Sequence, residues 1–286
     1  MKPNNTFKTI TIIGLGLMGG SLAAACRKKF PRAKITGVSR SLGALKQAKR
    51  LGWIHEGTGD LAAGIKQADL AILATPVDTL ARLLLQIESA RRPPALRGLL
   101  VTDVGSIKGD LQAWADRRRW KNISFVGAHP MTGSHERGIA AASAGIYDHG
   151  FTFIVRGRSA KPAAYRAVLQ FWKKISPKVV EISAKAHDRI TSDISHLPHA
   201  VAMSLVLSVK AGSLKFAASG FRDTTRIALG DASIWAPILA GNRKALAESL
   251  AGFEKSLARV RAAISSKDRQ NLAKLIGEAA RRRRQI

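Results

Sequence analysis

The chain of 286 residues is 46% apolar and carries a formal net charge of +28 at pH 7. This length allows one large core or two modest ones, and it favours two domains. The longest nearly apolar run, Ala200 to Val209, has only half of the roughly 20 residues that a membrane-spanning helix requires. Glycines interrupt the apolar stretch near the N-terminus, so we expect neither a membrane span nor an export signal.

Cysteine content and charge narrow the class of protein further. The single cysteine, Cys26, excludes an internal disulfide framework and a cysteine-built metal site, which fits a cytoplasmic protein. The positive charge would attract nucleic acid or small anionic ligands. Because the basic residues are spread along the chain without a nucleic-acid-binding motif, we expect a solvated basic surface and regard nucleic acid as the less favoured partner.

The first half of the chain alternates β-rich runs with helical patterns, which indicates a parallel sheet with crossover helices. Helices are expected at Ser21–Lys29 and Ser41–Gly52. The expected strands lie within residues 8–14, 34–39, 70–75, 99–105, 123–130, 151–157 and 179–183. The fold class predicted here is therefore α/β, with a parallel sheet and crossover helices in the N-terminal part.

After Ser183 the pattern becomes helical, so we divide the chain into domains at residues 1–183 and 184–286. The long segment Ala186–Gly212 reads as a core helix, although Pro198 lies inside it. A proline in that position removes one backbone hydrogen bond, which predicts a bent helix near a site.

A glycine-rich loop follows the first expected strand. Gly14, Gly16 and Gly19 form the pattern G-x-G-x-x-G between a strand and a helix, the context in which this pattern indicates dinucleotide binding. The first glycine permits a tight turn, the second lets a pyrophosphate approach, and the third lets helix and strand pack closely.

The second expected strand ends about 20 residues further on, where this fold meets the adenosine ribose. An acidic residue there would favour NAD, but this chain has Ser39 and Arg40. A serine and an arginine can both bind a phosphate, so NADP is the favoured cofactor. The alternative is an NAD enzyme on which Arg40 is an ordinary surface residue.

Further candidate residues follow other strands. The segments Ala74–Pro76 and Asp103–Lys108 close two strands and should border the nicotinamide, because ligands bind at the carboxyl ends of parallel strands. His129 precedes a proline at another strand end, where it can meet a substrate. His196 and His199 lie one turn apart on the helical part, but no acidic partner at matching spacing supports a metal site, so none is predicted.

Six segments in order resemble one known family. They are "GLGLMGGSLA", "ATP", "TDVGSIK", "HPMTGS", "ISHLPHA" and "GFRDTTRIALGDASIW", within about Thr9 to Leu257. Together they closely resemble the prephenate and arogenate dehydrogenases of tyrosine biosynthesis. The resemblance implies a Rossmann domain followed by a helical dimerisation domain, with the active site between them. The implied reaction is the oxidative decarboxylation of prephenate to 4-hydroxyphenylpyruvate, with arogenate as the alternative substrate.

The same resemblance assigns roles to residues. His129 matches the catalytic histidine that accepts the hydrogen bond of the ring hydroxyl, and Ser106 matches the serine that holds both that hydroxyl and the histidine. Arg226 matches the arginine that binds a substrate carboxylate. The other expected substrate contacts are His199, His196, Ser134, His135 and Trp235. The expected cofactor contacts are Gly14, Leu15, Gly16, Leu17, Met18, Gly19, Ser39, Arg40, Ser41, Ala74, Thr75, Pro76 and Asp103.

One position departs from the family pattern. Many relatives have an acidic residue where this chain has His135, followed by Glu136. A missing carboxylate removes a partner for the ammonium group of arogenate, which favours prephenate. We expect a stand-alone homodimeric enzyme. The rival hypotheses are a β-hydroxyacid dehydrogenase, a pyrroline carboxylate reductase, or a nucleic-acid-binding protein on a Rossmann scaffold.

Overall fold

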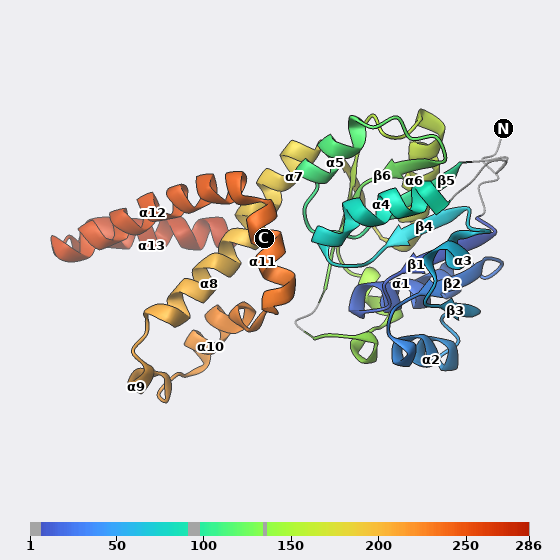
Figure 1. Ribbon diagram of the computed structural model, residues 1–286. Coiled ribbons are helices and arrows are strands. Elements are labelled where there is room, and N and C mark those ends of the chain that lie inside the picture. The colour runs from blue at the N-terminus through green and yellow to red at the C-terminus, as the bar shows by residue number, and fades with distance from the viewer. Residues whose placement is uncertain (1–6, 91–97, 134–135, 286) are drawn as a thin grey trace.

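The computed structural model describes residues 7–90, 98–133 and 136–285. Its N-terminal part is built on a six-stranded sheet with the order β3-β2-β1-β4-β5-β6 (Figure 1). The strands are β1 (Thr9–Ile13), β2 (Lys34–Val38), β3 (Glu56–Thr58), β4 (Leu70–Leu73), β5 (Leu99–Asp103) and β6 (Ile123–Val126). All neighbouring pairs are parallel, so the carboxyl ends of the strands share one edge. The strand order reverses between β1 and β4, where ligands bind in such sheets. The predicted Rossmann fold is confirmed.

Helices cover both faces of this sheet (Figure 1). They are α1 (Leu17–Lys29), α2 (Leu42–Arg50), α3 (Leu61–Ile65), α4 (Leu80–Ala90), α5 (Gly109–Asp116) and α6 (Pro162–Ile175), with the short turn η1 (Val77–Thr79) before α4. The central strands bury alternate residues in two different clusters: Ile12 packs on one side of the sheet and Ile13 on the other. Burial on both faces explains why these strands are apolar runs rather than alternating patterns.

A second, three-stranded sheet lies beside the first. It contains β7 (Ala128–Met131), β8 (Phe151–Val155) and β9 (Val179–Ile182), with β7 antiparallel and β9 parallel to β8. Two short turns, η2 (Ile139–Ala141) and η3 (Ala144–Tyr147), precede β8. The single strand predicted at residues 123–130 is thus two strands in two sheets. The chain divides at Gly127, where a side chain would come within 3.1 Å of Cδ of Lys108.

After β9 every described element is helical. Ser183 accepts a hydrogen bond from the amide of Ala186 and caps the first helix. The elements are α7 (Ala184–Thr191), the π-helical turn η4 (Ser192–His196), α8 (Leu197–Ser208), α9 (Ala211–Leu214), α10 (Ser219–Thr225), the turn η5 (Arg226–Leu229), α11 (Ala232–Gly241), α12 (Arg243–Ser265) and α13 (Arg269–Arg283).

The helical segment around Pro198 is continuous from Ala184 to Ser208 and contains a π turn just before the proline, while the predicted bend stays a prediction. In η4 the amide of Leu197 reaches back to the carbonyl of Ser192, five residues earlier. A π turn of this kind is uncommon and is often found at functional sites. The turn carries His196 and leads directly into the segment with His199.

The hairpin of α12 and α13 projects away from the sheets (Figure 1). Only Leu246 and Ala263 of α12 are buried, and α13, which is described in full, buries no residue. Large apolar side chains of the helical part remain exposed, including Leu207 at 78% and Phe216 at 77%. Within the described residues no helix is both long and apolar enough to cross a membrane.

Candidate active site

The glycine loop between β1 and α1 has the geometry that a dinucleotide requires. Gly14 has φ of 95°, and a Cβ there would lie 2.6 Å from the carbonyl oxygen of Ala74. A Cβ on Gly19 would lie 1.8 Å from the carbonyl oxygen of Gly14, whereas one on Gly16 would meet nothing within 4 Å. Gly16 also begins α1 without a side-chain cap, which leaves amides of the first turn available to an anion. These features fit a bound pyrophosphate.

Other expected cofactor residues lie around this loop. Leu15 is buried beneath it and Leu17 is half-buried. The carbonyl of Met18 accepts the hydroxyl of Tyr147. At the end of β4, beside Ala74 and Pro76, the hydroxyl of Thr75 lies 2.7 Å from that of Thr79. Leu15 can therefore meet a cofactor only through its backbone.

The loop after β2 presents two serines and an arginine. Ser41 caps α2 by accepting a hydrogen bond from the amide of Ala44, and Ser39 accepts one from the amide of Ser41. Arg40 is exposed and forms no ion pair with any residue that the structure describes. The first turn of α2 contains no acidic residue. This loop is thus positively charged and free of carboxylates.

Asp103, an expected cofactor contact, has a structural role inside the protein. Its side chain is fully buried and pairs with Lys108. Its oxygens also accept hydrogen bonds from the amides of Gly105 and Ala128. Because its oxygens are engaged inside the protein, the side chain of Asp103 supports the loop after β5 and anchors the start of β7, and a contact between Asp103 and the cofactor stays a prediction.

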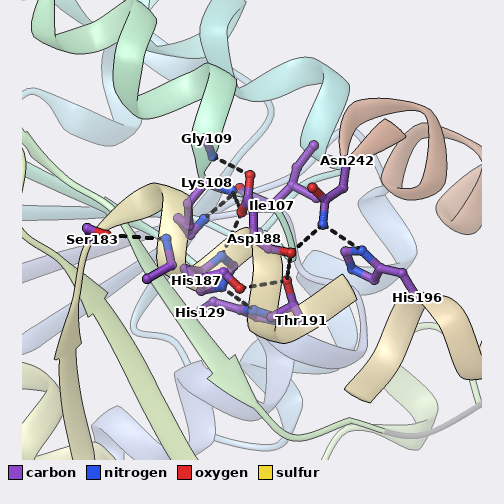
Figure 2. A network of polar contacts seen from close by, with 12 residues as sticks. Ile107, Lys108, Gly109, His129, Ser183, His187, Asp188, Thr191, His196 and Asn242 are labelled. Atoms are coloured by element: carbon purple, nitrogen blue, oxygen red, sulfur yellow. Dashed lines mark hydrogen bonds and ion pairs between the residues drawn. The ribbon is translucent and has the colours of Figure 1, made fainter. Parts of the chain in front are cut away.

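His129 lies in β7 and is buried against the first helix of the helical part. Its Nδ1 atom lies 2.9 Å from Nε2 of His187, and Nδ1 of His187 lies 2.7 Å from a carboxylate oxygen of Asp188 (Figure 2). Burial lowers the pKa of His129 well below its usual value, and the nearby Lys108 acts in the same direction, as protonation of His187 would. His129 is therefore a neutral base at neutral pH.

Ser106 is half-buried in the loop after β5. The hydrogen bond to His129 that the family resemblance implies is not formed, and the hydroxyl has no hydrogen-bond partner within the described ranges. This hydroxyl is therefore free to bind a ligand.

His196 occupies the π turn and is 1% exposed. Its Nδ1 lies 3.0 Å from the side-chain amide nitrogen of Asn242, which also donates to the carbonyl of Asp188 (Figure 2). Since that amide donates, Nδ1 accepts and the proton of neutral His196 is on Nε2. Nε2 is buried without a partner in residues 7–90, 98–133 and 136–285. A buried donor without a partner is costly, which points to a ligand that accepts from it.

His199 stacks on Trp235, with ring centroids 3.3 Å apart. Gly230 makes room for this pair, because a Cβ there would lie 2.6 Å from the Trp235 ring. Burial lowers the pKa of both His196 and His199 to about 4, so both are neutral near pH 7. The described residues contain no group of three or more histidine, cysteine or acidic side chains that could hold a metal ion.

The structure describes only some of the other expected substrate contacts. Arg226 begins η5, is exposed, and has no ion-pair partner in the part of the chain that the structure describes. Ser134 and His135 lie outside the described residues. Just after them, Arg137 forms an ion pair with Asp231, the residue that caps α11. This ion pair is therefore a second contact between the nucleotide-binding and helical parts, in addition to the contact between His129 and His187.

The comparisons with known proteins agree with this arrangement. The model of the prephenate dehydrogenase nucleotide-binding domain matches residues 22–181, and that of the prephenate dehydrogenase dimerization domain matches residues 183–278. The chain belongs to the prephenate dehydrogenase family. It is therefore an NAD(P)-dependent oxidoreductase. This family assignment replaces the rival hypotheses of a β-hydroxyacid dehydrogenase and a pyrroline carboxylate reductase.

Individual members of the family resemble almost the whole chain. Prephenate dehydrogenase of Bacillus subtilis (strain 168) is 34% identical, over 94% of this chain and 73% of its own length. The structure of Aquifex aeolicus prephenate dehydrogenase with hydroxyphenyl propionate and NAD+ has a TM-score of 0.88 and 28% identity, and the match covers 97% of this chain and 98% of that one. Synechocystis arogenate dehydrogenase has a TM-score of 0.76 and 26% identity, with 97% and 99% covered.

Proposed function

We propose that this chain oxidatively decarboxylates prephenate to 4-hydroxyphenylpyruvate with NADP as the hydride acceptor. The observation that carries the proposal is the buried, neutral His129, whose Nδ1 is occupied by His187 and whose Nε2 forms no hydrogen bond with the described chain. A secondary alcohol that is oxidised must lose its hydroxyl proton, and Nε2 can accept it. Bound NADP supplies the hydride acceptor for the same carbon.

The other side chains hold the substrate. The Ser106 hydroxyl is free to bind the ring hydroxyl, and Nε2 of His196 is a donor in need of an acceptor. We assign Arg226 to a substrate carboxylate, because its guanidinium has no ion-pair partner within the described residues. Loss of carbon dioxide makes the ring aromatic, so much of the driving force comes from the substrate. The protein mainly orients the reacting groups.

The choice of prephenate over arogenate rests on the sequence after β7. Position 135 is a histidine where an acidic residue would attract the ammonium group of arogenate. The test is an absorbance assay of reduced nicotinamide with each substrate combined with each cofactor. Higher kcat/KM with prephenate supports the proposal. Activity with arogenate alone would contradict the substrate assignment, and activity with neither would contradict the function.

The choice of NADP predicts the effect of one substitution. Arg40→Asp should reverse or flatten the preference for NADP over NAD, because a carboxylate replaces a phosphate-binding cation. The lost contact corresponds to about 1.5 to 3 kcal/mol, or about a 10- to 150-fold change in the ratio of kcat/KM values. Arg50→Asp is the matched control, since Arg50 is an exposed arginine at the other end of α2. Equal efficiency with both cofactors, unchanged by Arg40→Asp, would contradict the assignment.

We also propose that the enzyme is a homodimer that works in the cytoplasm. The matched dimerization domain and the exposed apolar residues of the helical part support the dimer. Leu207, Phe216 and Leu229 are each more than three-quarters exposed, and a second copy would cover such surface. Light scattering of the purified chain measures its mass directly.

A further inference from the structure

A chain of hydrogen bonds leads from His129 to a carboxylate in the helical part. His187 stands between them, with Nε2 2.9 Å from Nδ1 of His129 and Nδ1 2.7 Å from Oδ1 of Asp188 (Figure 2). His187 is fully buried and Asp188 is 8% exposed. The contacts are therefore shielded from water, where each hydrogen bond acts more strongly than at the surface.

The chemistry of the carboxylate decides the direction of every bond in this chain. Burial would raise the pKa of Asp188, but hydrogen bonds from His187 and from two backbone amides hold it below its usual value. Asp188 is therefore ionised and only accepts, so Nδ1 of His187 donates to it. Burial lowers the pKa of His187, which is thus neutral with Nε2 as an acceptor. His129 must then donate from Nδ1, and its Nε2 is left as a free lone pair.

We propose that His187 and Asp188 are positioning residues that fix His129 in the tautomer with the proton on Nδ1. This inference rests on the proposed function, in which Nε2 of His129 accepts the substrate hydroxyl proton. In that step the substrate O–H bond breaks and an Nε2–H bond forms, while the proton on Nδ1 stays in place. Without His187, neutral imidazole would divide between two tautomers, one of which has no lone pair at Nε2.

The hydrogen-bonded series His129–His187–Asp188, called the relay below, also stabilises the positive charge that forms on His129. When Nε2 takes up a proton, the ring becomes positive, and the Asp188 carboxylate lies one imidazole away. The other titratable groups near this ring are His187, His196 and Lys108, and Lys108 is already paired with Asp103. The negative charge of the Asp188 carboxylate thus stabilises protonated His129 through His187.

Asp188 is itself held by the nucleotide-binding part. Its carboxylate accepts the amide of Lys108 at 2.8 Å and that of Gly109 at 2.7 Å. These amides begin α5, which has no cap from its own N-cap side chain. The Asp188 carboxylate therefore caps α5 of the nucleotide-binding part and also orients His129 through His187. The relay is complete only when the nucleotide-binding and helical parts are in contact.

Nitrogen NMR of the histidine rings in the NADP-bound enzyme tests the tautomer directly. Long-range proton–nitrogen spectra distinguish a ring nitrogen that carries a proton from one that does not. In wild type we expect the proton on Nδ1 and a bare Nε2 in His129. His187→Leu should give a mixture of tautomers. A proton on Nε2 in the wild type would overturn the proposal.

Kinetics of matched variants separate positioning from folding. His187→Leu should lower kcat by about 10- to 100-fold with the substrate KM within about twofold, because His187 acts through His129. His187→Gln retains an acceptor oxygen for Nδ1 of His129, so it should keep the tautomer and recover part of kcat. His149→Leu is the control, since His149 is exposed. Normal kcat and an unchanged tautomer in His187→Leu would overturn the proposal.

The spectra also keep this inference distinct from the proposed function. A wild-type enzyme that oxidises neither prephenate nor arogenate but shows the Nδ1-protonated tautomer would contradict the function and support the relay. An enzyme that oxidises prephenate with the proton on Nε2 of His129 would support the function and overturn the relay.

Discussion

Replacing His129 by asparagine should lower kcat by about 10²- to 10⁴-fold while cofactor affinity stays nearly unchanged. Asparagine can still hold the substrate hydroxyl, but it cannot accept the proton. Cofactor binding depends on the glycine loop after β1 rather than on β7, so it should not change. Steady-state kinetics and cofactor titration measure the two effects separately. His149→Asn, at an exposed histidine, is the control.

The same substitution should change the pH profile. Wild-type kcat should decline on the acid side with a single apparent pKa as His129 becomes protonated. Because burial lowers the pKa of His129, this decline should lie below the ordinary value of about 6.5. The acid limb should vanish in the variant. Near-normal kcat with the same acid limb would mean that another group takes the proton, and His196 or His199 would be the next candidates.

Replacing Arg226 by alanine should chiefly weaken substrate binding. A carboxylate is bound in both the ground state and the transition state, so KM should rise while kcat changes little. Loss of a charge-assisted pair should lower kcat/KM by about 10- to 150-fold, and Arg226→Lys should fall between alanine and wild type. Arg222→Ala is a matched control, since Arg222 is an exposed arginine one turn earlier in α10. Normal substrate affinity in Arg226→Ala would remove this residue from the pocket.

The parts of the fold that depend on local pattern could be predicted from the sequence. The glycine loop and the apolar runs of β1, β2, β4 and β5 predicted the parallel sheet. The short strand β3 was not predicted, because its sequence Glu56–Thr58 is polar and partly exposed. The division at Gly127 was also missed, since residues 125–128 are continuously apolar and only the pairing of β7 with β8 reveals two strands.

Only those residues of the active site that lie in a recognisable sequence motif could be predicted. His129, His196 and His199 stand in recognisable segments, and their roles stay predictions. His187 and Asp188 were overlooked within the same helical segment, because nothing local relates them to His129, 58 positions away in the chain. Asn242 was missed for the same reason, since its partner His196 is 46 positions distant. The ion pair between Asp103 and Lys108 was also missed, because the position of Asp103 at a strand end does not reveal that Lys108 folds back onto it.

The π turn at Ser192–His196 has a consequence for the rotational phase of the long helix. Each residue of a regular α-helix turns the chain by about 100°, so His187 and His196, nine positions apart, would face opposite sides. A π turn absorbs one extra residue and reduces this separation to about 80°. His187 can then orient the base while His196 faces the same site. The active site thus depends on how many residues separate its histidines as well as on which residues they are.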